Sequence, residues 1–333
     1  MIRCGNGPPE QELARAACDR GGVNLPPLDL GQLVGQSQAR PGVLAVAVAL
    51  AVAYLVLARR VPGWPMARTA SFLGGLAVVV IVTNSGIEAY GHVLEWVHMI
   101  EHLALIMVAP VLLAIGSPLQ LVPGLRPVLA RPVVSWLTSP AAAAILYTVA
   151  VVGVHLTGIM DRAMTDPGVH VAEELTYLVS GYLLFQLVFG QWPGPWQLTG
   201  AGRMTLLALI TPVDTIVGVV LLQTGTVEGG LPDAPHGHPR PDWALSAAAD
   251  TVAAGTTMWI GGTGIMAGLM LFVGLVWLHG RPPVQTAPSW TERARQSVYA
   301  SRTGESADAE LDDDDAALAA YNRWLAKMHE RDD

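Results

Sequence analysis

The strongest constraint in this sequence is a series of long apolar segments that contain no Asp, Glu, Lys or Arg. A helix needs about 20 mostly apolar residues to cross the hydrocarbon core of a bilayer. Such segments cover 41–58, 69–87, 103–125, 132–160, 175–202 and 251–280, and a further one, 204–224, is interrupted only by Asp214. Their apolar residues are continuous rather than alternating, which argues against transmembrane β-strands.

We therefore predict an all-α, polytopic membrane protein with about seven transmembrane helices. The charged fraction of 14% agrees with this class, since a soluble domain carries about 25%. The helices are expected at 42–59, 69–90, 92–116, 137–158, 168–190, 203–224 and 250–279. The predicted regions are a polar tail at 1–40, a transmembrane domain at 41–280, and an acidic tail with a short amphipathic helix at 281–333.

The arginines predict the orientation, because cytoplasmic loops of membrane proteins carry an excess of Lys and Arg. The loops after the first, third and fifth predicted spans contain arginines and no acidic residue: Arg59, Arg60, Arg68, Arg126, Arg131 and Arg203. The alternate loops contain acidic residues such as Glu88 and Asp161. We expect the basic loops and the C-terminus in the cytoplasm and the N-terminus outside.

Ionisable residues within the third predicted span are candidate functional residues, because such groups are costly inside a membrane. His98 and His102 are four residues apart, so both rings project from one face of the helix. Met99 and Glu95 flank this face, and Glu101 lies on the same helix. With the helix running inward, the pair is expected in the outer half of the bilayer.

Other predicted spans bring similar groups to the same depth. His155 lies near the outer end of the fourth span. The fifth begins with a stripe at helical spacing formed by His170, Glu173, Glu174 and Tyr177. Asp214, in the middle of the sixth, should pair with a histidine or accept a hydrogen bond. The convergence of four histidines indicates a metal site. Histidine with methionine suits copper, whereas imidazole alone also suits zinc or iron.

Ordered motifs extend over nearly the whole chain: WPMART (64–69), SGIEAY (85–90), HMIEHLALIMVAP (98–110), VHLTGIMDRAM (154–164), VHVAEEL (169–175) and WALSAAADTVAAGTTMWIGG (243–262). These motifs resemble those of CtaG-type multi-spanning cytochrome c oxidase assembly proteins of Gram-positive bacteria. The chain departs from the family pattern at three positions. Glu101 and Leu103 replace Gln and Met of HMxQHM, and Glu174 replaces the second His of HxxEH.

The resemblance implies a multi-pass protein of the bacterial plasma membrane that helps to form a copper centre of haem-copper oxidase. Oxidase subunits and the lipid bilayer would be its partners, and the net charge of -8 does not favour nucleic acid. We expect a copper-handling chaperone rather than an enzyme. The expected metal ligands are His98, His102, His155, His170 and, as a soft auxiliary ligand, Met99. The residues expected to orient ligands or relay protons are Glu95, Glu101, Glu173, Glu174 and Asp214.

Three other functions are compatible with these residues. Two histidines on facing helices, such as His102 with His155 or His170, would suit the axial ligation of haem in a b-type cytochrome. Intramembrane carboxylates would suit a copper or proton transporter. A scaffold would bind oxidase subunits without any metal.

Overall fold

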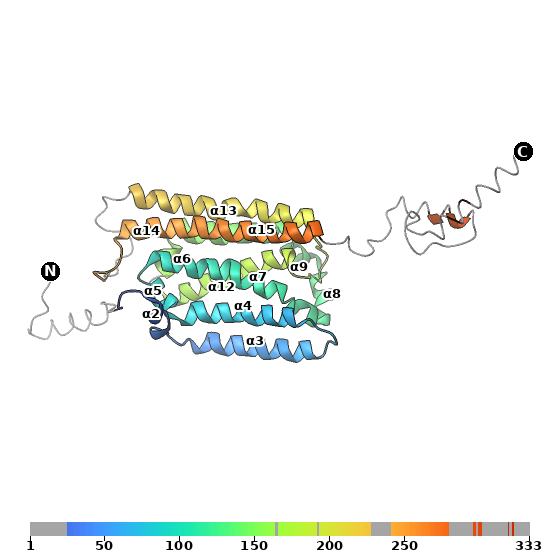
Figure 1. Cartoon of the computed structure of the whole chain (residues 1–333), viewed down its shortest axis with the longest axis horizontal. Helices are drawn as coiled ribbons and strands as arrows, with labels where there is room; N and C mark the ends of the chain where they lie inside the picture. Colours follow the sequence, from blue (N-terminus) through green and yellow to red (C-terminus); the bar gives the residue numbers. More distant parts are fainter. Residues whose placement is uncertain are drawn as a thin grey trace, which may run out of the picture. The chain divides into compact units, whose positions relative to one another are not determined.

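The computed structural model describes residues 25–163, 166–191, 193–227 and 241–279, with a few positions in the C-terminal tail. The described residues form helices and no strands, so the all-α prediction is confirmed. Within residues 25–274 the long helices run side by side as a bundle (Figure 1). Cys4, Cys18 and nearly all of the predicted amphipathic tail helix lie outside the described residues.

The long helices follow the predicted segments closely. Five are continuous: α3 (Pro41–Arg59), α4 (Met66–Asn84), α10 (Pro140–His155), α12 (Pro167–Val188) and α13 (Gly200–Val227). Two more are built from consecutive pieces that include a π-helical turn. They comprise α6 (Glu95–Leu103), η1 (Ala104–Val108) and α7 (Ala109–Ile115), and then α14 (Ala247–Thr256), η4 (Thr257–Gly261) and α15 (Gly262–His279). The short connecting helices are α2 (Leu30–Gly35), α5 (Gly86–Gly91), η2 (Pro118–Leu121), η3 (Pro123–Leu125), α8 (Arg126–Leu129), α9 (Pro132–Leu137) and α11 (Ile159–Ala163).

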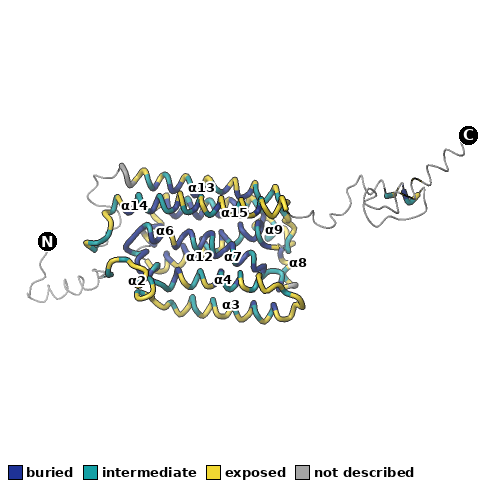
Figure 2. The backbone as a smooth tube through the Cα atoms, in the orientation of Figure 1, coloured by how far each residue is buried: buried dark blue, intermediate teal, exposed yellow. Residues whose placement is uncertain are grey.

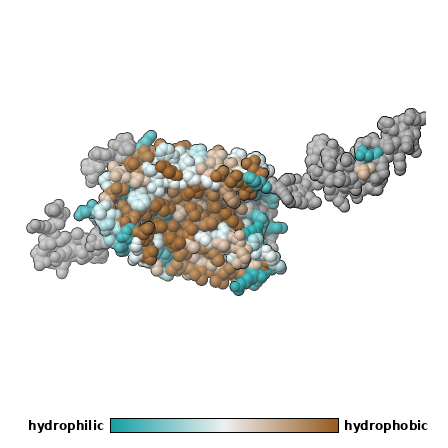
Figure 3. All heavy atoms as spheres, viewed as in Figure 1, coloured by the Kyte–Doolittle hydropathy of each residue, from teal (hydrophilic) through white to brown (hydrophobic). Residues whose placement is uncertain are grey.

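Five of the described helical segments are long and apolar enough to cross a membrane: Pro41–Arg59, Met66–Asn84, Glu95–Leu121, Gly200–Thr224 and Ala247–His279. Two shorter or more polar helices run beside them. Helix α10 has 16 residues, and the 22 residues of α12 include Glu173 and Glu174. Figure 3 shows a broad apolar surface over the helices, with polar residues gathered mainly toward the two ends. Seven spans are reached only if α10 and α12 also cross.

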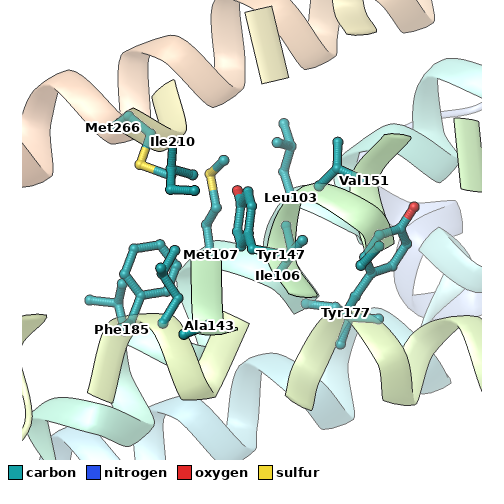
Figure 4. Close-up of a cluster of buried hydrophobic side chains, with 14 of the residues drawn as sticks. Leu103, Ile106, Met107, Ala143, Tyr147, Val151, Tyr177, Phe185, Ile210 and Met266 are labelled. Atoms are coloured by element: carbon teal, nitrogen blue, oxygen red, sulfur yellow. The ribbon is translucent and has the colours of Figure 1, made fainter. Parts of the chain in front are cut away.

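The combined helix of α6, η1 and α7 lies at the centre of the bundle. Its apolar window is 72% buried, whereas that of α3, which packs on α4, is 17% buried (Figure 2). Helices α4 and α12 pack against α7, α14 packs against α6, and α10 contacts both α12 and α13. The main apolar cluster lies where these helices meet, and Figure 4 shows Met107, Tyr147, Phe185, Ile210 and Met266 within it.

Helix α6 begins at Glu95 rather than at the predicted His92. Leu94 precedes it in an extended conformation and has no side-chain oxygen to cap the first backbone N–H groups. The buried carboxylate of Asp250, on α14, takes this role from a distant part of the chain. It accepts hydrogen bonds from the backbone N–H groups of Glu95 at 2.9 Å and Trp96 at 3.2 Å. Asp250 therefore fixes where α6 starts.

The π-helical turn η1 lies where α12 approaches the central helix most closely. Pro110 has no N–H, so the carbonyl of Ile106 lacks its usual helical donor four residues later. Gly181 of α12 faces this carbonyl, and a Cβ at that position would overlap the oxygen of Ile106. Only glycine allows the two backbones to approach this closely.

Replacing Gly181 by alanine is expected to lower the free energy of unfolding by about 1–3 kcal/mol, because α12 must move away from η1. Gly153→Ala in α10 is the matched control, since a Cβ there meets nothing within 4 Å. Thermal unfolding of both variants in detergent measures the difference. Equal melting temperatures would contradict this account of η1.

Candidate metal centre

Four histidines and four glutamates gather in one buried cluster at the end of the bundle where α6 and α12 begin. They come from α5, α6, α10 and α12, and all eight are buried. The members of this His–Glu cluster are Glu88, His98, Glu101, His102, His155, His170, Glu173 and Glu174. Buried carboxylates are costly unless cations or hydrogen-bond donors compensate them. Nearby cations are therefore the first feature to examine.

The deeper part of the cluster surrounds one carboxylate, Glu173. An oxygen of Glu173 lies 3.2 Å from His102 Nε2, 3.6 Å from His170 Nδ1 and 3.8 Å from His98 Nε2. The predicted i, i+4 geometry is confirmed, since the His98 and His102 rings are 4.1 Å apart. One donor atom each from His98, His170 and Glu173 lie within 4.8 Å of one another. We call His98, His102, His170 and Glu173 the inner group.

His155 orients His102 through a chain of hydrogen bonds. The Nδ1 of His155 lies 2.8 Å from the carbonyl of Val151, which only accepts, so this nitrogen carries the proton. In a neutral ring, Nε2 of His155 is then the acceptor, and it lies 3.2 Å from Nδ1 of His102. His102 donates there, which leaves its own Nε2 with a free lone pair directed at Glu173.

A second set of residues, closer to the surface, shares His170 with the inner group. Nε2 of His170 lies 3.4 Å from Glu88, 3.6 Å from Glu174 and 3.9 Å from Glu101. Donor atoms of these four residues lie within 4.8 Å of one another. We call Glu88, Glu101, His170 and Glu174 the outer group.

Arg40, the residue before α3, brings a guanidinium to the outer group. It donates two hydrogen bonds to Glu174, at 2.5 and 2.8 Å, and lies 3.4 Å from Glu88. Burial alone would lower the pKa of Arg40, but these carboxylates raise it above its usual value. A pocket of about 370 Å³ adjoins this pair, lined by Gln38, Arg40, Glu88, His92, Ala163, Pro167, His170 and Val171.

Several buried polar atoms of the cluster have no hydrogen-bond partner among the described residues. They are both ring nitrogens of His98, Nε2 of His102, Nδ1 of His170, and both carboxylate oxygens of Glu101 and Glu173. Native proteins rarely leave such groups unsatisfied. Imidazole nitrogens and carboxylate oxygens that converge without donors between them form a suitable set for a divalent transition-metal ion.

Three predicted site residues have their described contacts outside these two groups. Met99 is fully buried in the main apolar cluster. Glu95 accepts a 2.7 Å hydrogen bond from Thr251 of α14. Asp214 accepts hydrogen bonds from the Tyr147 hydroxyl at 3.1 and 3.4 Å, as one of its predicted alternatives required. The ligand set thus consists of nitrogen and oxygen, without the predicted sulfur.

The sequence analysis missed four residues that shape this region. Glu88 was assigned to a loop, although it belongs to the SGIEAY motif, which provided a signal. His92 lies in the turn after α5, 3.4 Å from Glu88, rather than on the helix of His98. Asp250 belongs to the last motif, but nothing in the sequence indicates its partner on α6. For Arg40, at the end of a polar tail, no signal existed.

Comparison with known proteins places this arrangement in a family. Two relatives are the uncharacterized proteins Mb0105 of Mycobacterium bovis and MT0111 of Mycobacterium tuberculosis, each 29% identical over 301 residues. These matches cover 86% of this chain and 42% of the relatives. The uncharacterized protein ML1998 of Mycobacterium leprae is 27% identical over 304 residues, which are 85% of this chain and 43% of the relative. This chain thus spans about two fifths of the length of these relatives.

No solved structure is significantly similar to this chain. A family profile described as cytochrome c oxidase caa3 assembly factor (Caa3_CtaG) matches residues 48–280. The matched region covers most of the chain and includes α5, α6, α10 and α12, which contribute all eight residues of the His–Glu cluster. This chain therefore belongs to the family of cytochrome c oxidase caa3 assembly factors.

Proposed function

We propose that this protein handles a copper ion during the assembly of cytochrome c oxidase, and that the inner group holds the ion. The main support is the set of unpartnered donor atoms in a buried site. Nε2 of His102 and an oxygen of Glu173 are both acceptors and lie only 3.2 Å apart, so a cation between them is required to relieve their repulsion. The family supplies the link to an oxidase.

In this proposal copper is a cargo, and the residues of the chain hold and orient it. His98, His102 and His170 would supply imidazole nitrogens, and Glu173 a charged oxygen. This mixture of nitrogen and oxygen suits copper(II), whereas sulfur ligands favour copper(I). The proposed role is therefore that of an assembly factor with a metal-binding site and no catalytic step.

We also infer that α10 and α12 cross the membrane, which gives seven spans with the N-terminus outside. The basic loops support this orientation by the positive-inside rule. The His–Glu cluster would then open to the outside of a bacterial plasma membrane. This is the side on which we expect copper centres of the oxidase to be filled.

Deletion of the gene, followed by measurement of copper in the purified oxidase, tests this function. We expect the copper content of the oxidase to fall, and to recover with the wild-type gene or with added copper. A gene carrying Glu173→Gln should fail to restore it, whereas Glu95→Gln, which keeps an acceptor for Thr251, should succeed. Full recovery with Glu173→Gln would instead favour a metal-free scaffold. A Soret band in the purified protein would favour haem.

His155→Phe is expected to weaken copper binding roughly 10–100-fold, because the outer partner of a metal-binding histidine fixes its tautomer. The phenyl ring fills a similar space but cannot accept the proton of His102 Nδ1. Competition with a chelator of known copper affinity measures the loss. His155→Gln should recover most of it, since its amide oxygen can accept that proton. Wild-type affinity in both variants would contradict the orienting role.

A further inference from the structure

We propose that the outer group is a second cation site, and that the guanidinium of Arg40 occupies part of it until a divalent metal ion displaces it. The proposal rests on the function proposed above, because it adds a station between the pocket and the inner group. Its ligands would be three carboxylates and one imidazole, from Glu88, Glu101, Glu174 and His170. A site of this composition suits a harder divalent cation better than copper(I).

The two nitrogens of His170 face the two groups. Nδ1 lies 3.6 Å from Glu173 of the inner group, whereas Nε2 lies 3.4 Å from Glu88 and 3.6 Å from Glu174. A ring between two sets of acceptors provides one donor atom to each. The outer group is therefore a distinct position that shares a single ligand with the inner group.

Glu101 gives independent support for a ligand at this position. Its side chain is 1% exposed, and neither carboxylate oxygen has a hydrogen-bond partner among the described residues. One of these oxygens lies 3.9 Å from His170 Nε2, within the set of four converging atoms. A buried carboxyl group without donors is costly. Arg40 contacts Glu88 and Glu174 but leaves the Glu101 oxygens unpartnered, so a further cation has a place there.

Arg40 is placed to be displaced rather than to seal the site permanently. Its side chain is 21% exposed and lines the pocket beside Glu88 and His92. Its backbone N–H is fixed by a 2.6 Å hydrogen bond to the Asn84 side chain, so only the side chain needs to move. Burial would raise the pKa of Glu88, but hydrogen bonds from His170 and His92 and the charge of Arg40 hold it below its usual range. The carboxylate is thus ready to bind another cation.

Titration of the purified full-length protein with Mn²⁺ tests the proposal, because manganese prefers oxygen ligands. The disappearance of the free Mn²⁺ paramagnetic resonance signal reports binding. Arg40→Gln should increase Mn²⁺ affinity about tenfold or more, since the competing charge-assisted hydrogen bonds are removed. Arg40→Lys, which keeps the charge but loses the paired hydrogen bonds, should give a smaller increase.

The matched control is Arg68→Gln. Arg68 lies in the first turn of α4, donates to Gln120 at 2.8 Å and stacks on Trp64, away from the His–Glu cluster. Its replacement should leave Mn²⁺ affinity at the wild-type value. Adding Glu101→Gln and Glu174→Gln to Arg40→Gln should remove the gain in affinity. A gain that survives both glutamate replacements, or equal affinities in the two arginine variants, would overturn the outer site.

Copper retention separates this result from the function proposed above. His98→Ala with His102→Ala removes inner ligands only, so it should abolish copper retention while the Mn²⁺ gain of Arg40→Gln persists. If copper retention is unchanged by the histidine replacements, the inner site is wrong. If the histidine replacements abolish copper retention but Arg40→Gln leaves Mn²⁺ affinity unchanged, only the outer site is wrong.

Discussion

Replacing His98 and His102 together by alanine is expected to reduce the copper retained by the purified protein at least about tenfold. The change removes two of the three imidazoles around Glu173, and copper depends strongly on nitrogen donors at such a site. Elemental analysis of protein purified in parallel, at equal protein concentration, measures the loss. The fold should persist, because both rings contact other polar groups of the cluster rather than the main apolar core.

Two control variants make this result specific. His279→Ala removes an exposed histidine from the end of α15, whose ring contacts the carbonyl of Leu275. Met99→Leu removes the sulfur that the sequence suggested as a soft ligand, while it keeps the packing of a buried apolar residue. Both should retain copper at the wild-type level. Loss of copper with Met99→Leu would return methionine to the ligand set, and retention in the double histidine variant would exclude the inner group.

Replacing Asp250 by alanine is expected to destabilise the protein by roughly 2–4 kcal/mol. Two backbone N–H groups at the start of α6 would lose their shared acceptor in a buried position, and Leu94 has nothing to offer in its place. The melting temperature in detergent measures the change. Copper affinity should also fall, because a frayed first turn of α6 no longer holds His98 and His102 in position.

The chain offers a graded series for this test. Asp250→Asn keeps one carbonyl oxygen and should lose only part of the stability. Asp242→Ala replaces an exposed aspartate eight residues earlier in the chain and should have little effect. If all three variants melt at the wild-type temperature, the contact between α14 and α6 does not depend on this cap.

The differences between this chain and the family pattern fall in the outer group. Glu101 and Glu174 stand where the pattern has Gln and His, and both lie within 4 Å of His170. Each change adds negative charge to a buried site, and Arg40 compensates Glu174 directly. A neutral glutamine or histidine at these positions would not need that guanidinium. The charge balance of the site is therefore a property of this chain and its particular residues.

Periodicity and spacing predicted much of this protein because they depend on neighbours along the chain. Apolar runs located every long helix to within a few residues, since a helix end is set largely by local residues such as Asp166, whose carboxylate accepts hydrogen bonds from the N–H groups of Gly168 and Val169. The i, i+4 spacing placed His98 and His102 on one face. Both are consequences of helical geometry alone.

Contacts between distant segments were beyond reach of the sequence alone. Arg40 pairs with Glu174, and Asp250 caps α6, only because packing brings residues more than 130 positions apart into contact. The same packing directs Glu95 to Thr251 and buries Met99 in the apolar cluster. A sequence determines which side chains share a helical face, because that follows from a fixed rise and rotation per residue. Which groups that face meets depends on how whole helices pack, and only the tertiary structure decided it.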